Sequence, residues 1–308
     1  MEHIYDTIII GGGPAGLSAG LYASRSRMDT LIIERAAYGG QVATTDELDN
    51  YPGSIENATG VSLSKRMKDQ AEEFGTKFVN EEVAGVELEG DIKVIRCIKE
   101  SYKAKTIIIA TGAYPRLGGF KNETELRGKG VSYCATCDAD FFADLDIAVL
   151  GGGDSAISEA IYLAKFGETV TVIHRRDELR AAKSLQEKAF INPKIKFVWD
   201  TVVEEAKGKE ILEGLVLKNI KTGKVSELKA DGCFVFVGYL PISELFKGKI
   251  TMNERGDIIT DEEMRTNIPG VYAAGDIRVK LLRQVITAAA DGAIAATHAE
   301  HYIESQLN

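Results

Sequence analysis

The sequence predicts an α/β protein of two Rossmann-like domains, the second inserted into the first. Two strand–glycine turn–helix–strand units, which begin near Tyr5 and Asp146, share one layout about 140 residues apart. The C-terminal segment contains a strand and a long helix but has no glycine turn of its own, so we expect it to complete the first sheet. The length of 308 residues suits roughly two domains.

The first unit, Tyr5–Glu34, reads YDTIIIGGGPAGLSAGLYASRSRMDTLIIE. It predicts a strand at Thr7–Ile10, a helix that begins at Pro14, where the missing N–H costs nothing, and a strand at Thr30–Ile33. The glycines at the G-x-G-x-x-G spacing are Gly11, Gly13 and Gly16. This spacing lets the backbone approach a pyrophosphate, to which the helix N-terminus offers free N–H groups.

The second unit, Asp146–Arg180, repeats this layout. A strand at Ile147–Leu150 leads to three glycines, Ala156 takes the place of the third motif glycine, and a strand follows at Val170–Ile173. Two glycine motifs in the same strand–turn–helix–strand context indicate dinucleotide binding more strongly than one motif does. The alternative is that both are only tight turns between a strand and a helix.

The two units differ at the end of their second strands. Glu34 and His174 each follow the first glycine of their unit by 23 residues. An acidic residue there binds an unphosphorylated adenosine ribose, as in FAD or NAD. A basic cluster instead matches the 2′-phosphate of NADPH, and here it comprises Arg175, Arg176 and Arg180. The alternative for the stretch HRRDELR is a solvated basic turn.

The remaining elements follow from periodicity and turn residues. The predicted elements are an irregular loop at 36–53, a helix at 60–75, a hairpin of Val83–Leu88 and Ile92–Ile98, a buried strand at Thr106–Gly112, a helix around Glu178–Phe190, a strand at Ile195–Trp199, a meander to Pro241, a strand at Val271–Ala274 and a helix from about Arg283.

Composition and charge argue against several classes of partner, location and framework. The net charge of −9, with no long basic run, argues against a nucleic-acid partner. No stretch approaches 18 apolar residues and the N-terminus lacks the features of a signal peptide, so we expect no membrane span and a cytoplasmic location. Four cysteines do not form a disulfide framework, and Cys97 and Cys233 are expected to be buried small apolar residues.

The other two cysteines form the motif Cys134-Ala-Thr-Cys137, followed by Asp138. A zinc site would need a second close pair of ligands, which the sequence lacks, so no metal is expected. A structural staple across so short a loop would stabilise the fold by only about 2 kcal/mol. Thiol–disulfide exchange is favoured, because it needs one attacking and one resolving thiol close together. Asp138 would act as general acid or base for the pair, or cap the helix that begins there.

These residues together resemble the low-molecular-weight, bacterial-type thioredoxin reductases, which are class II pyridine nucleotide-disulfide oxidoreductases. The matching pieces, in the family's order over nearly the whole chain, are GGGPAG at 11–16, GGQ at 39–41, NYPG at 50–53, ATG at 110–112, CATCD at 134–138, GGGDSA at 151–156, HRRDELR at 174–180 and AAGD…RQ at 273–284. The resemblance implies domains of the three-layer ββα type in a homodimer. It places the FAD domain at 1–116 and 246–308 and the NADPH domain, which carries the cysteine pair, at 117–245.

The resemblance also assigns roles to residues at matching positions. It implies that FAD is held by Gly11, Gly13, Pro14, Ala15, Gly16, Glu34, Gly40, Gln41, Asn50, Val83, Thr111, Gly112, Gly275, Asp276, Arg283 and Gln284. It implies that NADPH is held by Gly151, Gly153, Asp154, Ser155, His174, Arg175, Arg176 and Arg180.

The implied reaction passes electrons from NADPH to FAD, then to the Cys134–Cys137 disulfide and on to the disulfide of thioredoxin. Cys134 would attack thioredoxin, and the inserted domain would rotate on hinges at Pro115–Gly119 and around Ser243–Gly248. Two alternatives remain open. The first is a flavin disulfide reductase with another acceptor, such as a glutaredoxin-like or peroxiredoxin system, or with a donor other than NADPH. The second is a flavin-bound redox sensor without turnover.

Overall fold

The computed structural model describes residues 3–44, 48, 50–56 and 58–306. The chain forms two compact units, Met1–Tyr114 with Leu240–Asn308 (unit 1) and Pro115–Tyr239 (unit 2). The chain passes between them within β7 (Ala113–Pro115) and β16 (Tyr239–Pro241), which form a two-stranded sheet. The segment Ser243–Gly248, where a hinge is expected, belongs to unit 1, and the Phe246 side chain is buried in the core of that unit. The hinge stays a prediction.

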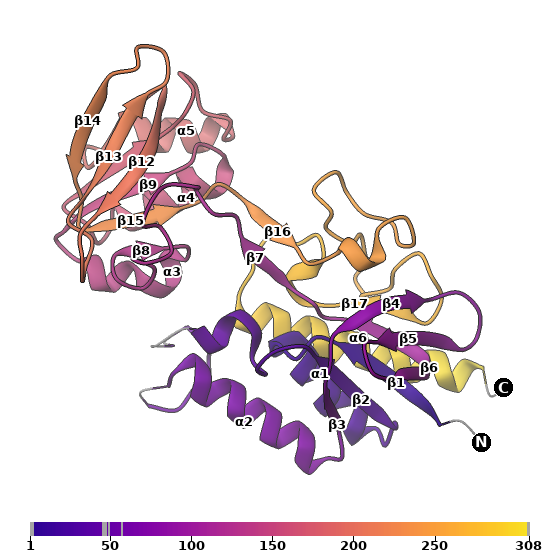
Figure 1. Ribbon diagram of the computed structural model, residues 1–308. Coiled ribbons are helices and arrows are strands. Elements are labelled where there is room, and N and C mark those ends of the chain that lie inside the picture. The colour runs from indigo at the N-terminus through magenta and orange to yellow at the C-terminus, as the bar shows by residue number, and fades with distance from the viewer. Residues whose placement is uncertain (1–2, 45–47, 49, 57, 307–308) are drawn as a thin grey trace. The chain divides into compact units, whose positions relative to one another are not determined.

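Unit 1 contains a seven-stranded sheet in the order β3-β2-β1-β6-β5-β4, with β17 paired to β6 (Figure 1). Strands β1, β2, β3, β6 and β17 run parallel, and β4 and β5 form an antiparallel hairpin. The strands are β1 (Ile4–Ile10), β2 (Thr30–Glu34), β3 (Lys77–Asn80), β4 (Val83–Glu87), β5 (Lys93–Cys97), β6 (Ser101–Ile109) and β17 (Val271–Ala273). The helices are α1 (Pro14–Arg25), η1 (Gly40–Thr44), α2 (Gly60–Glu73), η3 (Glu244–Phe246), η4 (Gly275–Ile277) and α6 (Val285–Ser305).

The pairing of β17 with β6 confirms that the C-terminal segment completes the first sheet. Alternate residues of the parallel strands point to opposite faces, so the sheet buries two cores. On one face, Ile9, Ile32 and Ile108 pack against α1 and α6. On the other face, Ile8 and Ile107 pack against the β4–β5 hairpin and the segment around Phe246. The result is three layers, with helices on one side of the parallel sheet and a hairpin on the other.

The contact between α1 and α6 depends on a small residue (Figure 1). A Cβ atom at Gly292 of α6 would lie 2.0 Å from the carbonyl oxygen of Ala15 in the first turn of α1. Gly292→Ala is therefore expected to force the helices apart and lower the free energy of unfolding by about 2 kcal/mol or more. Urea denaturation measures this change. The matched control is Gly85→Ala, because a Cβ there would meet nothing closer than the Arg96 Cβ at 3.9 Å. An equal loss in both variants would contradict the packing argument.

Unit 2 contains a five-stranded parallel sheet in the order β11-β10-β9-β15-β8 and an antiparallel meander, β12-β13-β14 (Figure 1). The strands are β8 (Val131–Ser132), β9 (Asp146–Leu150), β10 (Thr169–Ile173), β11 (Ile195–Val198), β12 (Thr201–Lys207), β13 (Gly214–Asn219), β14 (Val225–Lys229) and β15 (Gly232–Val235). The helices are α3 (Ala135–Asp138), η2 (Ala139–Phe142), α4 (Asp154–Leu163) and α5 (Lys183–Phe190). The α/β class with one Rossmann-like unit inserted into another is confirmed.

Two boundaries differ from the expectation for local reasons. Helix α5 begins at Lys183 and not near Glu178, because the preceding backbone bonds to the glycine turn: Arg180 N–H donates to Gly152 O at 2.8 Å and Ala182 N–H to Asp154 Oδ1 at 2.7 Å. Strand β3 was not predicted, since a short strand at a sheet edge needs few apolar residues.

Cys97 and Cys233 are buried free thiols, as predicted. Burial raises the pKa of Cys97 to about 11 and that of Cys233 to about 12, so neither thiol ionises near neutral pH. Within the described ranges, no helix is both long and apolar enough to cross a membrane.

Candidate functional site

The first glycine turn of unit 1 leaves a helix N-terminus open. Gly11 has a φ of +111°, and its Cβ would lie 2.3 Å from Ala110 O, so no larger residue fits there. Gly13 is the N-cap of α1, forms no side-chain cap, and has no described atom within 4 Å of where a Cβ would lie. The turn therefore leaves space beside the backbone of Gly13 at the N-terminus of α1, and bare backbone at a helix N-terminus is the arrangement that binds a pyrophosphate.

Glu34 lies at the end of β2 and faces this turn. Its carboxylate accepts from Gly12 N–H at 2.7 Å and from Ala36 N–H at 2.8 Å. These two bonds fix the carboxylate beside the turn, and a carboxylate has further lone pairs for ribose hydroxyls.

Several other predicted flavin residues come from distant parts of the chain, and two of them lie close to the turn and the start of α1. A Cβ at Gly40 would lie 3.4 Å from Gly13 Cα, and one at Gly275 would lie 2.8 Å from the Ala15 Cβ. Asn50 Nδ2 donates to Gln284 Oε1 at 3.2 Å, which joins residues 234 positions apart. Gln41 lies in η1 beside Gly40, and Pro14 and Gly16 lie in the first turn of α1.

The remaining predicted residues form contacts within the protein, and their part in FAD binding stays a prediction. Thr111 Oγ1 donates to Ile242 O at 2.8 Å, and Gly112 O accepts from Ile242 N–H at 2.9 Å, so both tie the end of the first segment to the returning chain. The Val83 side chain packs against the core.

Asp276 provides a test of whether a polyhydroxylated cofactor fits. Its Oδ1 is buried without a hydrogen-bond partner among the described residues. Burial raises the pKa of Asp276, against the opposing effect of the Lys280 and Arg283 cations. A buried acceptor without a hydrogen-bond donor destabilises a folded protein, and a hydroxyl of the ribityl chain of FAD would supply that donor. Arg283 lies nearby and donates to Asp257 Oδ1 at 3.1 Å. The residues of unit 1 therefore fit FAD.

The second glycine turn, in unit 2, repeats the open helix N-terminus. Gly151 has a φ of +148°, and Gly153 is the N-cap of α4 with no described atom within 4 Å of where its Cβ would lie. Asp154 and Ser155 form the exposed first turn of α4. A Cβ at Gly152 would lie 2.4 Å from the His174 ring, so this glycine lets the histidine pack directly on the turn.

The basic cluster beside this turn is arranged for an anion. The side chains of Arg175, Arg176 and Arg180 are exposed, and none of them forms an ion pair within the part of the chain that the structure describes. Burial, followed by these three cations, lowers the pKa of His174, so its ring is neutral near pH 7. The His174 Nε2 is buried and has no hydrogen-bond partner among the described residues. Three unpaired guanidinium groups next to an open helix N-terminus fit a phosphorylated dinucleotide.

The cysteine pair also belongs to unit 2. Cys134 and Cys137 form a disulfide with their Cα atoms 5.3 Å apart, and both are partly exposed. Cys134 is the N-cap of α3, and Asp138 ends that helix. Asp138 N–H donates to Cys134 O at 3.2 Å, which holds the carboxylate residue and the two sulfurs on a single helical turn.

Sequence reasoning missed a buried carboxylate next to this segment. Glu123 is 3% exposed and accepts three hydrogen bonds of 2.7 Å, from Gly118 N–H, Gly119 N–H and the Tyr133 hydroxyl. This network ties the segment that follows β7 to the residue directly before Cys134. No sequence pattern marks Glu123: its partners are only 4 to 10 residues away, but they lie in an irregular segment with no periodicity to show that the carboxylate is buried.

Glu123→Gln is expected to lower the free energy of unfolding by about 2–3 kcal/mol. The glutamine side chain has an NH₂ group in place of one carboxylate oxygen, and this NH₂ group would lie against a hydrogen-bond donor and could not accept its bond. Thermal and urea denaturation measure the loss. Glu125→Gln is the matched control, since Glu125 is exposed two residues further on. If both variants unfold alike, the three bonds to Glu123 do not stabilise the fold.

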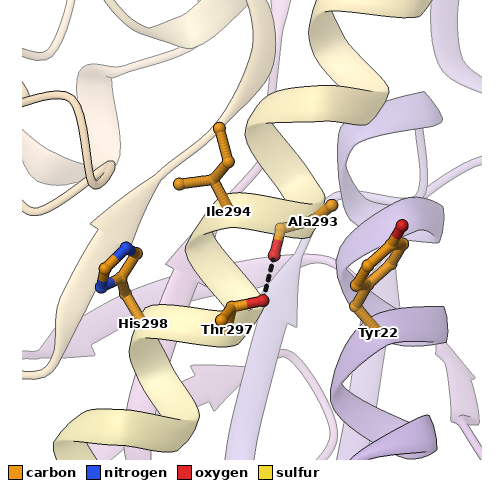
Figure 2. A pocket seen from close by; sticks show the side chains of 5 residues that line it. All are labelled: Tyr22, Ala293, Ile294, Thr297 and His298. Carbon is orange, nitrogen blue, oxygen red and sulfur yellow. Dashed lines mark hydrogen bonds between the residues drawn. The ribbon is translucent and has the colours of Figure 1, made fainter.

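A shallow pocket lies elsewhere in unit 1, between α1 and α6. It is lined by Tyr22 of α1 and by Ala293, Ile294, Thr297 and His298 of α6, and Figure 2 shows Ala293 and Thr297 on the side of α6 that is nearer to Tyr22. Its lining is mostly apolar, and the Thr297 hydroxyl already donates to Ala293 O at 3.0 Å. None of the predicted site residues lines this pocket, so it is separate from the glycine turn.

Comparison with known proteins places these features in a family. Residues 5–292 match the family model described as pyridine nucleotide-disulphide oxidoreductase. The chain is 58% identical to a thioredoxin reductase of Peptoclostridium acidaminophilum, over 100% of this chain and 99% of the relative. Among solved structures it is similar to a thioredoxin reductase from Streptococcus pyogenes, with a TM-score of 0.92 and 47% identity over 99% of this chain and 100% of that chain. It is less similar to a ferredoxin-flavin thioredoxin reductase from Clostridium acetobutylicum, with a TM-score of 0.55 and 29% identity over 99% of this chain and 100% of that chain.

Proposed function

The chain belongs to the pyridine nucleotide-disulphide oxidoreductase family, and we propose that it is a thioredoxin-disulfide reductase with NADPH as electron donor and FAD as cofactor, which maintains cell redox homeostasis. The observation that carries the proposal is the Cys134–Cys137 disulfide, which lies in the same unit as a glycine turn flanked by unpaired arginines. Relatives that share about half or more of the residues over the whole chain support the choice of thioredoxin as acceptor.

The two cofactor sites are assigned to separate units. The first glycine turn, Glu34 and Asp276 of unit 1 would hold FAD, and the second glycine turn with the arginine cluster of unit 2 would hold NADPH. When bound, FAD supplies the two-electron chemistry that connects NADPH with the disulfide. The protein contributes binding and orientation through these turns, and it contributes the thiols.

The roles of the two cysteines in the exchange with thioredoxin are those that the resemblance to the bacterial-type reductases implies. The Cys134 thiolate attacks one sulfur of the thioredoxin disulfide, forms a mixed disulfide and releases the other thioredoxin sulfur as a thiolate. Cys137 then attacks the Cys134 sulfur, which releases the second thioredoxin sulfur and restores the Cys134–Cys137 disulfide. Asp138 accepts the proton that a thiol of the pair loses and returns it to a departing sulfur.

Steady-state turnover with paired donors and acceptors tests the proposal. We expect oxidation of NADPH, much faster than that of NADH, with thioredoxin as acceptor. The main alternative concerns the donor, because a structural neighbour carries ferredoxin in its name. Turnover with reduced ferredoxin and none with NADPH would contradict the donor assignment. Turnover only with a glutaredoxin or a peroxiredoxin would contradict the acceptor assignment. A yellow protein without turnover on any pair would indicate a redox sensor.

A homodimer in the cytoplasm completes the proposal, with no nucleic-acid or membrane partner. The resemblance to the bacterial-type reductases supports the dimer, and the buried free thiols of Cys97 and Cys233 suit a reducing compartment. Light scattering of the flavin-loaded protein measures the oligomeric state.

A further inference from the structure

Ser132 lies two residues before Cys134, at the end of β8, and its side chain is 5% exposed. Its hydroxyl is within 2.6 Å of Asp138 Oδ2, a length typical of a bond to a charged carboxylate. The same oxygen accepts from Cys134 N–H at 3.1 Å. The carboxylate is the near acceptor for the single hydroxyl proton, since the other acceptor within reach, Cys134 O, lies at 3.4 Å, and a lone pair of Ser132 accepts from the backbone of the cysteine.

The strand holds this hydroxyl in place. Ser132 pairs with Phe234 of β15, which is fully buried and itself pairs with Val149 of β9. The hydroxyl therefore belongs to a rigid sheet, whereas Asp138 and the two cysteines lie on the short segment that follows. A donor on a rigid element can orient a carboxylate on such a segment.

We propose that Ser132 is a positioning residue for the dithiol reaction: it keeps Asp138 ionised and fixed beside the cysteine pair. The inference rests on the proposed function, because it assigns Ser132 to the proton transfer that accompanies thiol–disulfide exchange. A hydrogen bond donated to a carboxylate favours its charged form, so the loss of that bond makes the carboxylate hold its proton to higher pH.

The first test is titration of the Asp138 carboxyl carbon by NMR in the oxidised, FAD-loaded protein, with Asp138→Asn to assign the signal. In Ser132→Ala we expect the midpoint to move upward by roughly one pH unit, which corresponds to the loss of about a tenfold preference for the charged form. Ser132→Thr keeps a hydroxyl, so its midpoint should lie close to that of the unchanged protein. Other titratable groups on elements that pack against α3, namely Asp140 of η2 and Asp154 and Glu159 of α4, are retained in every variant.

The second test is the pH profile of thioredoxin reduction. Without the hydroxyl the carboxylate is no longer fixed beside the cysteine pair, so Ser132→Ala should lower kcat by about tenfold near neutral pH. The weaker preference for the charged form should move the acidic limb upward, and the KM for NADPH should not change. Ser226→Ala is the matched control, since Ser226 is an exposed serine on β14 of the same unit. A titration midpoint and a pH profile that match those of the unchanged protein would overturn the inference, even if Ser132→Ala were less stable.

The two readouts separate this inference from the proposed function. The carboxyl titration requires neither thioredoxin nor NADPH. If the unchanged protein fails to reduce thioredoxin, the proposed function fails, while a shifted midpoint in Ser132→Ala still supports the bond to Asp138. If the unchanged protein is active and the midpoint does not move, the function stands and the inference fails.

Discussion

Replacing Cys137 with serine is expected to abolish thioredoxin reduction, with a loss of at least about 10³-fold, because no second thiol remains to resolve the mixed disulfide. The two sulfurs lie on one helical turn, with their Cα atoms 5.3 Å apart, and the other two cysteines are buried. FAD binding and bleaching of the flavin absorbance by NADPH should persist, since neither requires the disulfide. Thioredoxin-dependent NADPH oxidation and single-turnover absorbance measure the two effects.

Comparing Cys137→Ser with Cys134→Ser shows which of the two sulfurs attacks thioredoxin. If Cys134 is the attacking thiol, Cys137→Ser should trap thioredoxin in a mixed disulfide that a non-reducing gel detects, and Cys134→Ser should not. Cys97→Ala is the control, because Cys97 is a buried free thiol in the other unit. If Cys137→Ser still reduced thioredoxin, the cysteine pair would not take part in the reaction. If only Cys134→Ser trapped thioredoxin, Cys137 would be the attacking thiol and Cys134 the resolving thiol.

Replacing both Arg175 and Arg176 by alanine should weaken the use of NADPH, and this is the second largest effect that we expect. Each guanidinium is exposed and without an ion-pair partner within the described part of unit 2. Losing two charge-assisted contacts of about 1.5 kcal/mol each should raise the apparent KM for NADPH by about 10²-fold. NADH has no 2′-phosphate, so its use should not change.

The control for this double variant removes the same charge elsewhere in unit 2. Lys224 and Lys229 are exposed residues at or beside β14, and Lys224→Ala/Lys229→Ala should leave the KM for NADPH unchanged if the effect is local. Steady-state kinetics with NADPH and with NADH measure both KM values in each variant. An NADPH KM within about twofold of the original would mean that HRRDELR is only a solvated turn.

Much of the fold and of the cofactor sites followed from local patterns. The two glycine turns, the strands that flank them and the acidic or basic residue after each second strand are short-range features. Their spacing reflects the geometry of a strand, a turn and a helix, which neighbouring residues largely determine. The disulfide was also predicted from spacing, because two intervening residues already bring the sulfurs within reach.

Tertiary structure alone decided which side chains meet. Residues far apart in the chain are joined by the bond from Asn50 to Gln284, 234 positions apart, and by the close approach of Gly275 to Ala15. The bonds to Glu123 and the bond from Ser132 to Asp138 join residues that are near in sequence, but they lie in irregular or very short elements that no periodic pattern predicts. The Asp276 oxygen that lacks a partner among the described residues likewise shows only in the folded unit. The sequence by itself thus determined the kind of protein and its cofactor turns, which depend on local backbone geometry. The hydrogen bonds of Ser132, Asp138 and Glu123 were decided only by the fold, because they depend on how side chains are buried and oriented, which no periodic pattern in the sequence encodes.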